Sequence, residues 1–198
     1  MAFIRKHSFK IAVLALCAAM AVYLLLSMKS DVEPLKDFGP APSFELSDLE
    51  GNKVTLEDTN GKVRLYYFYF SYCPDVCPPT TAQLAQVQDE MIRQGRFGKD
   101  VMITSITIDP ERDTPERIKE FADQFGVDYA GWNWLRGDEQ YTHEVAQKFG
   151  LSVIKADGNY SHTNIIFLVD QEGKIRKYLM ANEDLTTEQI IQDVESLL

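Results

Sequence analysis

Two cysteines four residues apart are the residues of this chain best suited to chemistry. Cys73 and Cys77 stand in the stretch FSYCPDVCP, residues 70–78, after an aromatic run and at the start of an expected helix. Residues i and i+4 share one face of a helix, with Cβ atoms about 5–6 Å apart. Two thiolates so placed can grip one metal ion or, after a modest backbone adjustment, form a disulfide. A helix N-terminus would also lower the thiol pKa, which favours the thiolate form.

A third ligand for a metal held by these sulfurs has to come from elsewhere in the chain. Of the three histidines, His7 lies in a basic N-terminal segment, and His143 is expected to be a solvated residue on a helix. His162 precedes the apolar run NIIFLVD and is the candidate ligand, although a histidine at a strand start is often an ordinary polar residue. Asp109 ends another predicted strand, where it could lie near the thiols or cap the following turn.

Two thiolates with one imidazole form a donor set that suits copper, Cu(I) especially, although zinc accepts the same ligands. A structural zinc site normally has four protein ligands, and no fourth cysteine or histidine is suitably placed in the sequence. The pattern therefore favours one copper ion per chain.

The sequence predicts alternating strands and helices, and these elements must position the candidate residues. KVRLYYFYF, residues 62–70, is a nearly continuous apolar run, typical of a strand buried on both faces. Pro78 and Pro79 fit the first turn of a helix, and Thr114 is the expected N-cap of another. The remaining predicted elements are a hairpin around Gly51, strands at 101–109, 132–137, 165–169 and after Gly173, a helix ending at Gly150, a hairpin around residues 157–158 and a C-terminal helix from residue 186.

This order of elements predicts an α/β domain with a mixed central sheet flanked by helices. In such domains the functional residues usually lie at the carboxyl ends of strands, where helices begin. Cys73 and Cys77 stand at such an end, which is not where inert core cysteines are expected.

The N-terminal segment predicts a membrane anchor. Residues 11–28, IAVLALCAAMAVYLLLSM, carry no charge. As a helix they would be roughly 27 Å long, close to the ~30 Å hydrocarbon thickness of a bilayer. Arg5, Lys6 and Lys10 precede the run, so the amino terminus should be cytoplasmic and the domain extracytoplasmic. A cleaved signal peptide and a lipid on Cys17 are the alternatives.

The predicted organisation is therefore a cytoplasmic tail and transmembrane helix over residues 1–30, a polar, proline-containing linker over 31–42, and one folded domain over 43–198. All 30 acidic residues but only 16 of the 20 basic ones follow residue 30, so that part carries a net charge of −14. Such a surface repels phosphate backbones, and nucleic acid is not an expected partner.

The chain resembles the SCO/SenC family of copper-handling proteins associated with cytochrome c oxidase assembly. The resemblance rests together on FSYCPDVCP, ITIDPERDTPER, WNWLRG and a histidine, His162, shortly before IIFLVDQEGKI, and it covers roughly residues 38–198. It implies a thioredoxin-like fold, an N-terminal membrane anchor and copper ligands at Cys73, Cys77 and His162. Thioredoxins use a C-x-x-C pair and a cis-proline before the facing strand, whereas here the spacing is one residue longer and the strand start reads SHTN.

The resemblance implies a membrane-anchored bacterial metallochaperone, monomeric, that delivers copper to the binuclear copper centre of a cytochrome c oxidase subunit. The rival interpretation is an enzyme, a thiol–disulfide reductase that keeps the cysteines of that subunit reduced. Both need Cys73 and Cys77, but only the first needs His162. A peroxidase-like activity is a weaker third alternative, because the pattern is a dithiol.

Overall fold

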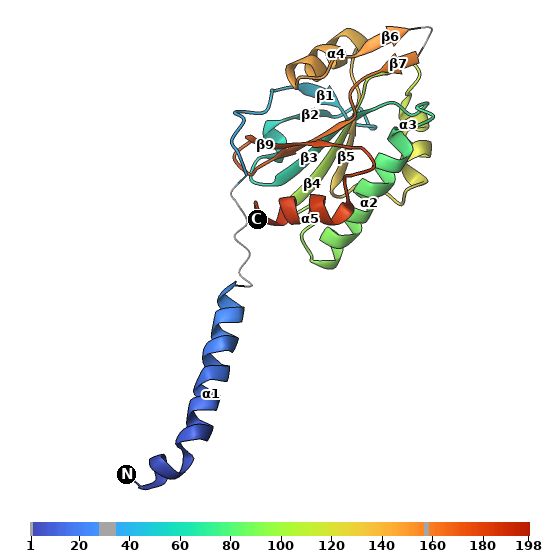
Figure 1. Ribbon diagram of the computed structural model, residues 1–198. Helices are drawn as coiled ribbons and strands as arrows, with labels where there is room; N and C mark the ends of the chain where they lie inside the picture. Colours follow the sequence, from blue (N-terminus) through green and yellow to red (C-terminus); the bar gives the residue numbers. More distant parts are fainter. Residues whose placement is uncertain (1, 28–34, 157–158) are drawn as a thin grey trace. The chain divides into compact units, whose positions relative to one another are not determined.

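The computed structural model describes residues 2–27, 35–156 and 159–198, with the backbone alone described at 2–6, 8, 24–27, 156 and 159. The chain divides into two compact units, Met1–Pro34 and Leu35–Leu198. The first unit contains helix α1, Ala2–Ser27 (Figure 1). Among the described residues, no helix has the length and apolar character needed to cross a membrane. The predicted anchor over 11–28 ends outside the described residues and stays a prediction.

The second unit is built on a five-stranded mixed sheet in the order β5-β4-β3-β8-β9. Strand β3 pairs in parallel with β4, and β4 pairs in parallel with β5. Strand β8 is antiparallel to both β3 and β9. These strands are β3 Val63–Tyr69, β4 Val101–Thr107, β5 Trp132–Leu135, β8 Ile165–Val169 and β9 Ile175–Met180. The predicted α/β class with a mixed central sheet is confirmed.

Helices and two small hairpins surround this sheet (Figure 1). The helices are α2 Cys77–Arg93, α3 Pro115–Asp123, α4 Glu139–Lys148 and α5 Thr187–Glu195, with a short 3-10 helix at Glu57–Thr59. The hairpin strands are β1 Glu45–Ser47 with β2 Lys53–Thr55, and β6 Ile154–Ala156 with β7 Asn159–Ser161. The turn of the second hairpin, residues 157–158, lies outside the described residues.

The alternation of side chains along β3 divides the core between the two faces of the sheet. Tyr66 and Phe68 contact the ring of Phe149, just after α4, with centroids 5.6 and 5.5 Å apart. Tyr69 points to the other face and stacks on Phe121 of α3 at 5.8 Å. Both faces of β3 are therefore buried, as its nearly continuous apolar sequence predicts, and Arg64 is buried with the apolar residues.

Two sequence-based expectations differ from the structure. The predicted linker over 31–42 joins the folded unit from Leu35, because Phe38 and Ala41 donate backbone hydrogen bonds to Ile175 and Gly173 beside β9. A helix with Leu84, Val87, Met91 and Ile92 on one apolar stripe is predicted after Pro79, but Ile92 is 44% exposed while Met91 is fully buried, because the two adjacent residues point to different sides of α2.

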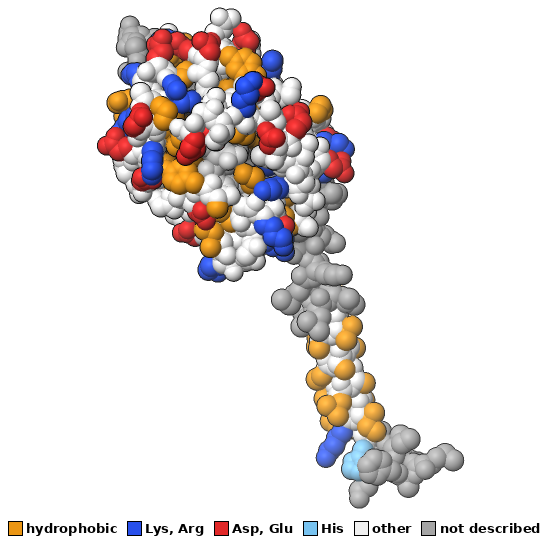
Figure 2. All heavy atoms as spheres, turned by 180° about the vertical axis from the view of Figure 1, so that it is seen from behind, with side chains coloured by type: hydrophobic (Ala, Val, Ile, Leu, Met, Phe, Trp, Pro, Cys, Tyr) orange, Lys and Arg blue, Asp and Glu red, His pale blue; other side chains and the backbone are white. Residues whose placement is uncertain are grey.

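Charged side chains of both signs are interspersed over the face of the second unit that Figure 2 shows. Helix α1, in contrast, presents apolar side chains along its described length, with residues such as Phe9, Leu14, Leu16 and Tyr23 exposed.

Candidate metal centre

Cys73 and Cys77 lie close together where the connection from β3 enters α2. Cys77 is the first residue of α2, with Pro78 and Pro79 in the first turn as expected. Cys73 does not share a helix face with it, because it lies in the turn before the helix. The Cys77 backbone N–H points at the Cys73 sulfur at 3.4 Å. Both thiols are free, with Cys73 8% exposed and Cys77 fully buried.

The turn that carries Cys73 is held by a buried carboxylate that sequence reasoning missed. Asp113 accepts hydrogen bonds from the Ser71 backbone N–H at 3.1 Å, from the Ser71 hydroxyl and from the Thr107 hydroxyl. Its side chain is fully buried, and burial raises its pKa. Asp113 therefore ties the turn after β3 to the end of β4. The signal in the sequence was a second acid four residues after Asp109.

An arginine secures the same turn from α3. Arg117 donates hydrogen bonds of 3.0 Å to both the hydroxyl and the carbonyl oxygen of Ser71. Its guanidinium also lies 4.7 Å from the ring centre of Tyr72, which is exposed beside Cys73. Arg112 approaches that ring as well, at 5.3 Å. The residues before Cys73 are thus fixed on both backbone and side-chain atoms.

The pKa values of the two cysteines are shifted in opposite directions. A hydrogen bond from Cys77 lowers the pKa of Cys73 to about 5, helped by the backbone N–H groups of Asp75, Val76 and Cys77 against the effect of burial. The same hydrogen bond, together with burial, raises the pKa of Cys77. Cys73 is therefore a thiolate at neutral pH and the less buried of the two sulfurs, and Cys77 is a buried proton donor to it.

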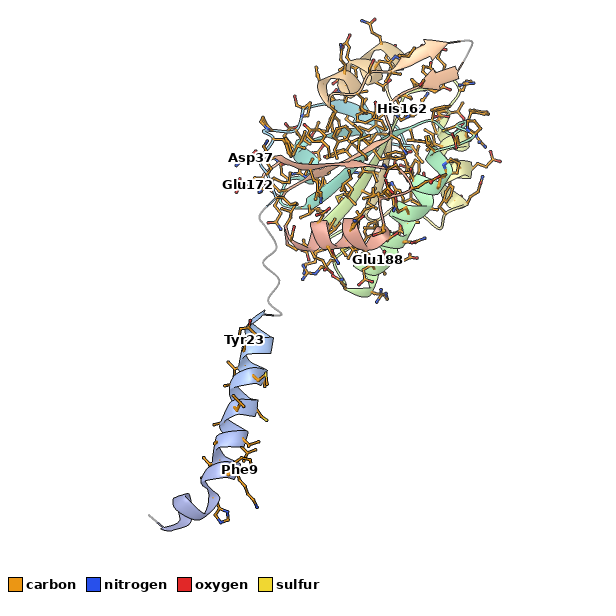
Figure 3. The ribbon with its side chains drawn as sticks, in the orientation of Figure 1. Phe9, Tyr23, Asp37, His162, Glu172 and Glu188 are labelled. Carbon is orange, nitrogen blue, oxygen red and sulfur yellow. The ribbon has the colours of Figure 1, made fainter. Side chains whose placement is uncertain are left out.

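His162 lies in the connection between β7 and β8 (Figure 3). Its Nδ1 is 2.9 Å from the carbonyl oxygen of Thr163, which places the ring proton on Nδ1. Its Nε2 is buried and has no hydrogen-bond partner. Burial lowers the pKa of His162, while the charge of Cys73 acts in the opposite direction. The ring is thus a neutral imidazole with an unused Nε2 lone pair within electrostatic reach of Cys73.

These donors fit a soft metal ion by their chemistry but do not form a finished metal site. Among the residues that the structure describes, no three His, Cys, Asp or Glu side chains are grouped as metal ligands. The structure brings Cys73 and Cys77 together, and His162 is within electrostatic range of Cys73 without being grouped with the two sulfurs. An unpartnered buried nitrogen beside a thiolate is the chemical feature that a copper ion would satisfy.

The other sequence candidates have structural roles. Asp109 forms an ion pair with Arg112, and its carbonyl oxygen accepts from the Asp113 N–H at 2.9 Å, which is the predicted turn-capping role. His143 was expected to be solvated, but it is half-buried and its Nε2 lies 2.7 Å from the carbonyl oxygen of Ile108. That expectation is wrong because the α4 face carrying His143 packs against the end of β4. Cys17 is exposed on α1.

A mixed α/β domain with a dithiol at the end of a central strand defines a thioredoxin-like class of protein. The model of the SCO1/SenC family matches residues 34–198, and the chain belongs to this family. It is 30% identical over 190 residues to the SCO1 protein homolog of Bacillus subtilis strain 168, a match that covers 92% of this chain and 91% of the relative. The resemblance predicted from the sequence motifs is confirmed.

Solved structures agree with this assignment. The structure of BsSco, a member of the Sco family of cytochrome c oxidase assembly proteins, superposes with a TM-score of 0.73 at 30% identity, covering 83% of this chain and 98% of that one. ScoI of Bradyrhizobium japonicum, solved with copper bound, gives a TM-score of 0.69 at 29% identity over 81% of this chain and all of that one. The predicted thioredoxin-like fold is thus the Sco fold.

Proposed function

We propose that this chain is an extracytoplasmic, membrane-anchored copper metallochaperone that delivers one copper ion per monomer to the binuclear copper centre of a cytochrome c oxidase subunit. The observation that carries the proposal is the juxtaposition of the Cys73 thiolate, the Cys77 thiol and the unpartnered Nε2 of His162. The copper bound by the Bradyrhizobium relative and the place of BsSco among oxidase assembly proteins support it.

The three side chains would contribute differently to copper binding. Cys73 is already a thiolate, whereas Cys77 must lose its proton when it coordinates, so binding releases a proton. His162 is neutral and can donate its Nε2 lone pair without losing a proton. The thiolates suit Cu(I), and the imidazole makes the set acceptable to Cu(II). The His162 ring has to shift toward the sulfurs to share their ion, since the three do not yet form a cluster.

The proposed location is a bacterial cell membrane, with a single span near the amino terminus. The uncharged run over residues 11–28 and the basic residues before it support this orientation. A chain lacking residues 1–30 should appear as a monomer in the soluble fraction, while the full chain should sediment with membranes. If the truncated chain stays with membranes, or needs detergent to remain dispersed, the anchor is assigned to the wrong segment.

A second function is favoured by the inequality of the two thiols. An accessible thiolate with a buried neighbouring thiol is the arrangement of a thiol–disulfide reductase. Cys73 would attack a client disulfide, and Cys77 would then displace the client sulfur. The client would be left with two thiols, and this chain with a Cys73–Cys77 disulfide. His162 has no part in that exchange.

Substitution of the histidine separates the two functions. In a strain lacking this protein, His162→Ala, Cys73→Ser and the wild-type chain would be expressed at equal levels, and oxidase activity and copper content would be measured. A metallochaperone with His162→Ala should assemble little active oxidase. Near wild-type assembly with His162→Ala, alongside failure with Cys73→Ser, would reject the chaperone and favour the reductase.

A further inference from the structure

Tyr160 anchors the hairpin that leads directly to His162. It lies on β7, two residues before the histidine, and is 7% exposed. Its ring contacts that of Phe70 at 5.9 Å and that of His143 at 5.5 Å. Phe70 in turn contacts the His162 ring at 6.5 Å and stands three residues before Cys73. Phe70 thus connects Tyr160 of the hairpin with His162, the candidate third ligand, and it stands at the start of the turn that carries Cys73.

Glu139 fixes the polar end of Tyr160. One oxygen of the Glu139 carboxylate accepts a hydrogen bond from the Tyr160 hydroxyl at 2.5 Å and another from Lys155 Nζ at 2.6 Å. Glu139 is the first residue of α4, where the helix dipole favours a negative charge. Lys155 lies on β6 and Tyr160 on β7, and the two are paired in the hairpin register. A single carboxylate on a helix therefore holds both strands.

The hairpin needs such an attachment because it is a separate two-stranded sheet with three residues in each strand. A hairpin of this size is marginally stable on its own. On its far side, Asn164 donates to the Thr80 hydroxyl at 2.9 Å and to the Ala181 carbonyl at 2.7 Å. Within the described contacts, the His162 side chain itself contributes a hydrogen bond to the neighbouring Thr163 carbonyl and a ring contact with Phe70. His162 therefore depends on Tyr160 before it and Asn164 after it for its place.

We propose that the Glu139–Tyr160 hydrogen bond positions His162 as the third copper ligand, so that Glu139 and Tyr160 are positioning residues of the metal centre. This inference rests on the proposed copper-binding function. Loss of the hydrogen bond lets the hairpin move and withdraws the imidazole from the sulfurs, while the dithiol, held by Asp113, stays in place. The effect should therefore fall on Cu(II), which needs the imidazole, and spare the chemistry of the two cysteines.

The test uses the full-length reduced chain in detergent, without oxygen, and four variants. Tyr160→Phe keeps the ring and removes the hydroxyl, and Glu139→Ala removes the acceptor. Glu144→Ala is the matched control, because Glu144 is exposed on the same helix and bonded only to Gln140 within the described contacts. His162→Ala is the reference for loss of the imidazole. Cu(II) affinity, the thiolate-to-copper absorption band and the Cys73–Cys77 reduction potential would be measured for each.

Tyr160→Phe and Glu139→Ala should each weaken Cu(II) binding by roughly tenfold, as loss of a residue behind a metal ligand commonly does. Both should change the absorption band toward that of His162→Ala and leave the reduction potential unchanged. Without metal, amide hydrogen exchange at residues 159–163 should be faster in both variants. Glu144→Ala should match the wild type in every measurement.

A double substitution separates positioning from general destabilisation. If Glu139–Tyr160 acts through the imidazole, Tyr160→Phe should cause no further loss of Cu(II) affinity in a chain that already carries His162→Ala. An equal loss in both backgrounds, or a shifted reduction potential, would overturn the inference. If His162→Ala weakens binding and Tyr160→Phe does not, the inference fails and the proposed function stands. If His162→Ala itself has no effect, the proposed function fails first.

Discussion

The turn that carries the cysteines and the connection that carries His162 both border the central sheet, but they are held by different kinds of contact. The cysteine turn continues from β3, and Asp113 and Arg117 bind its backbone directly. The His162 connection joins the small hairpin to β8 and is fixed mainly through the side chains of neighbouring residues. One half of the site is therefore set by the core, and the other by contacts on its edge.

The difference indicates how the two halves would share the proposed function. The two cysteine side chains are already arranged without a metal, because the Cys77 thiol donates a hydrogen bond that stabilises the Cys73 thiolate. The His162 imidazole is neutral and its Nε2 has no hydrogen-bond partner, but among the described residues it is not grouped with the sulfurs as a metal ligand. A site with two fixed soft ligands and one adjustable nitrogen ligand would accommodate either oxidation state of copper and release the ion by moving only its adjustable half.

The largest effect is expected from changes in the fixed half. Cys73→Ser or Cys77→Ser should remove tight binding of both Cu(I) and Cu(II), because each deletes one of two soft ligands. Anaerobic titration against a chromophoric copper chelator measures this directly. Cys17→Ser, in the other unit, should bind one copper ion per chain like the wild type. Wild-type affinity in either single variant at 73 or 77 would show that the two sulfurs do not share an ion.

An intermediate effect is expected from the carboxylate beneath the turn. Asp113→Ala leaves the Ser71 N–H and two hydroxyls without their acceptor, and the free energy of unfolding should fall by about 1–3 kcal/mol. Asp123→Ala, at an exposed site on α3, should change it by less than about 0.5 kcal/mol. Urea unfolding of the metal-free chains provides the measurement. Equal stability of the two variants would mean that Asp113 does not hold the turn.

The pH dependence of stability sharpens the same comparison. Burial raises the pKa of Asp113 above its unfolded value of about 3.9. Between the unfolded and folded pKa values, Asp113 keeps a proton in the folded chain that it has lost in the unfolded chain, so the contribution of Asp113 to stability should fall as the pH rises through this window. Asp113→Asn cannot ionise and should lack this decline. A wild-type curve parallel to that of Asp113→Asn would rule out a raised pKa.

The sequence was sufficient to predict the fixed half of the site and much of the sheet. The apolar run of β3, the prolines after Cys77 and the Thr114 N-cap are local signals, and each element lies where these signals place it. The structure brings Cys73 and Cys77 together, but the shared helix face that their spacing predicted is wrong, because α2 begins only at Cys77. Strand and helix ends shifted by one or two residues, because final hydrogen bonds depend on neighbours outside the segment.

The contacts around the site could not be predicted, because they join residues far apart in the chain. Asp113 meets Ser71 across 42 positions, and His143 meets Ile108 across 35. The spacing of Asp113 four residues after Asp109 does not by itself show that its carboxylate is buried and accepts from Ser71. The unused Nε2 of His162 is likewise a consequence of packing: Phe70 contacts the His162 ring, and Tyr160 packs on the Phe70 ring, which no local pattern predicts.

The smallest expected effect concerns the rates at which the two thiols react. Since hydrogen bonds lower the pKa of Cys73 to about 5, its alkylation by iodoacetamide in the reduced, metal-free chain should rise around that pH and be nearly constant above about pH 7. An unperturbed thiol, with a pKa of about 8.5, would still be rising there. Of the peptides that carry Cys73 and Cys77, mapping should find the label on that of Cys73, whatever the labelling of the exposed Cys17, and Cys73→Ser should leave the buried Cys77 almost unlabelled at neutral pH. A rate midpoint near 8.5, or equal labelling of both cysteines, would mean that Cys77 does not stabilise a Cys73 thiolate and that the fixed half of the site is not prepared before copper arrives.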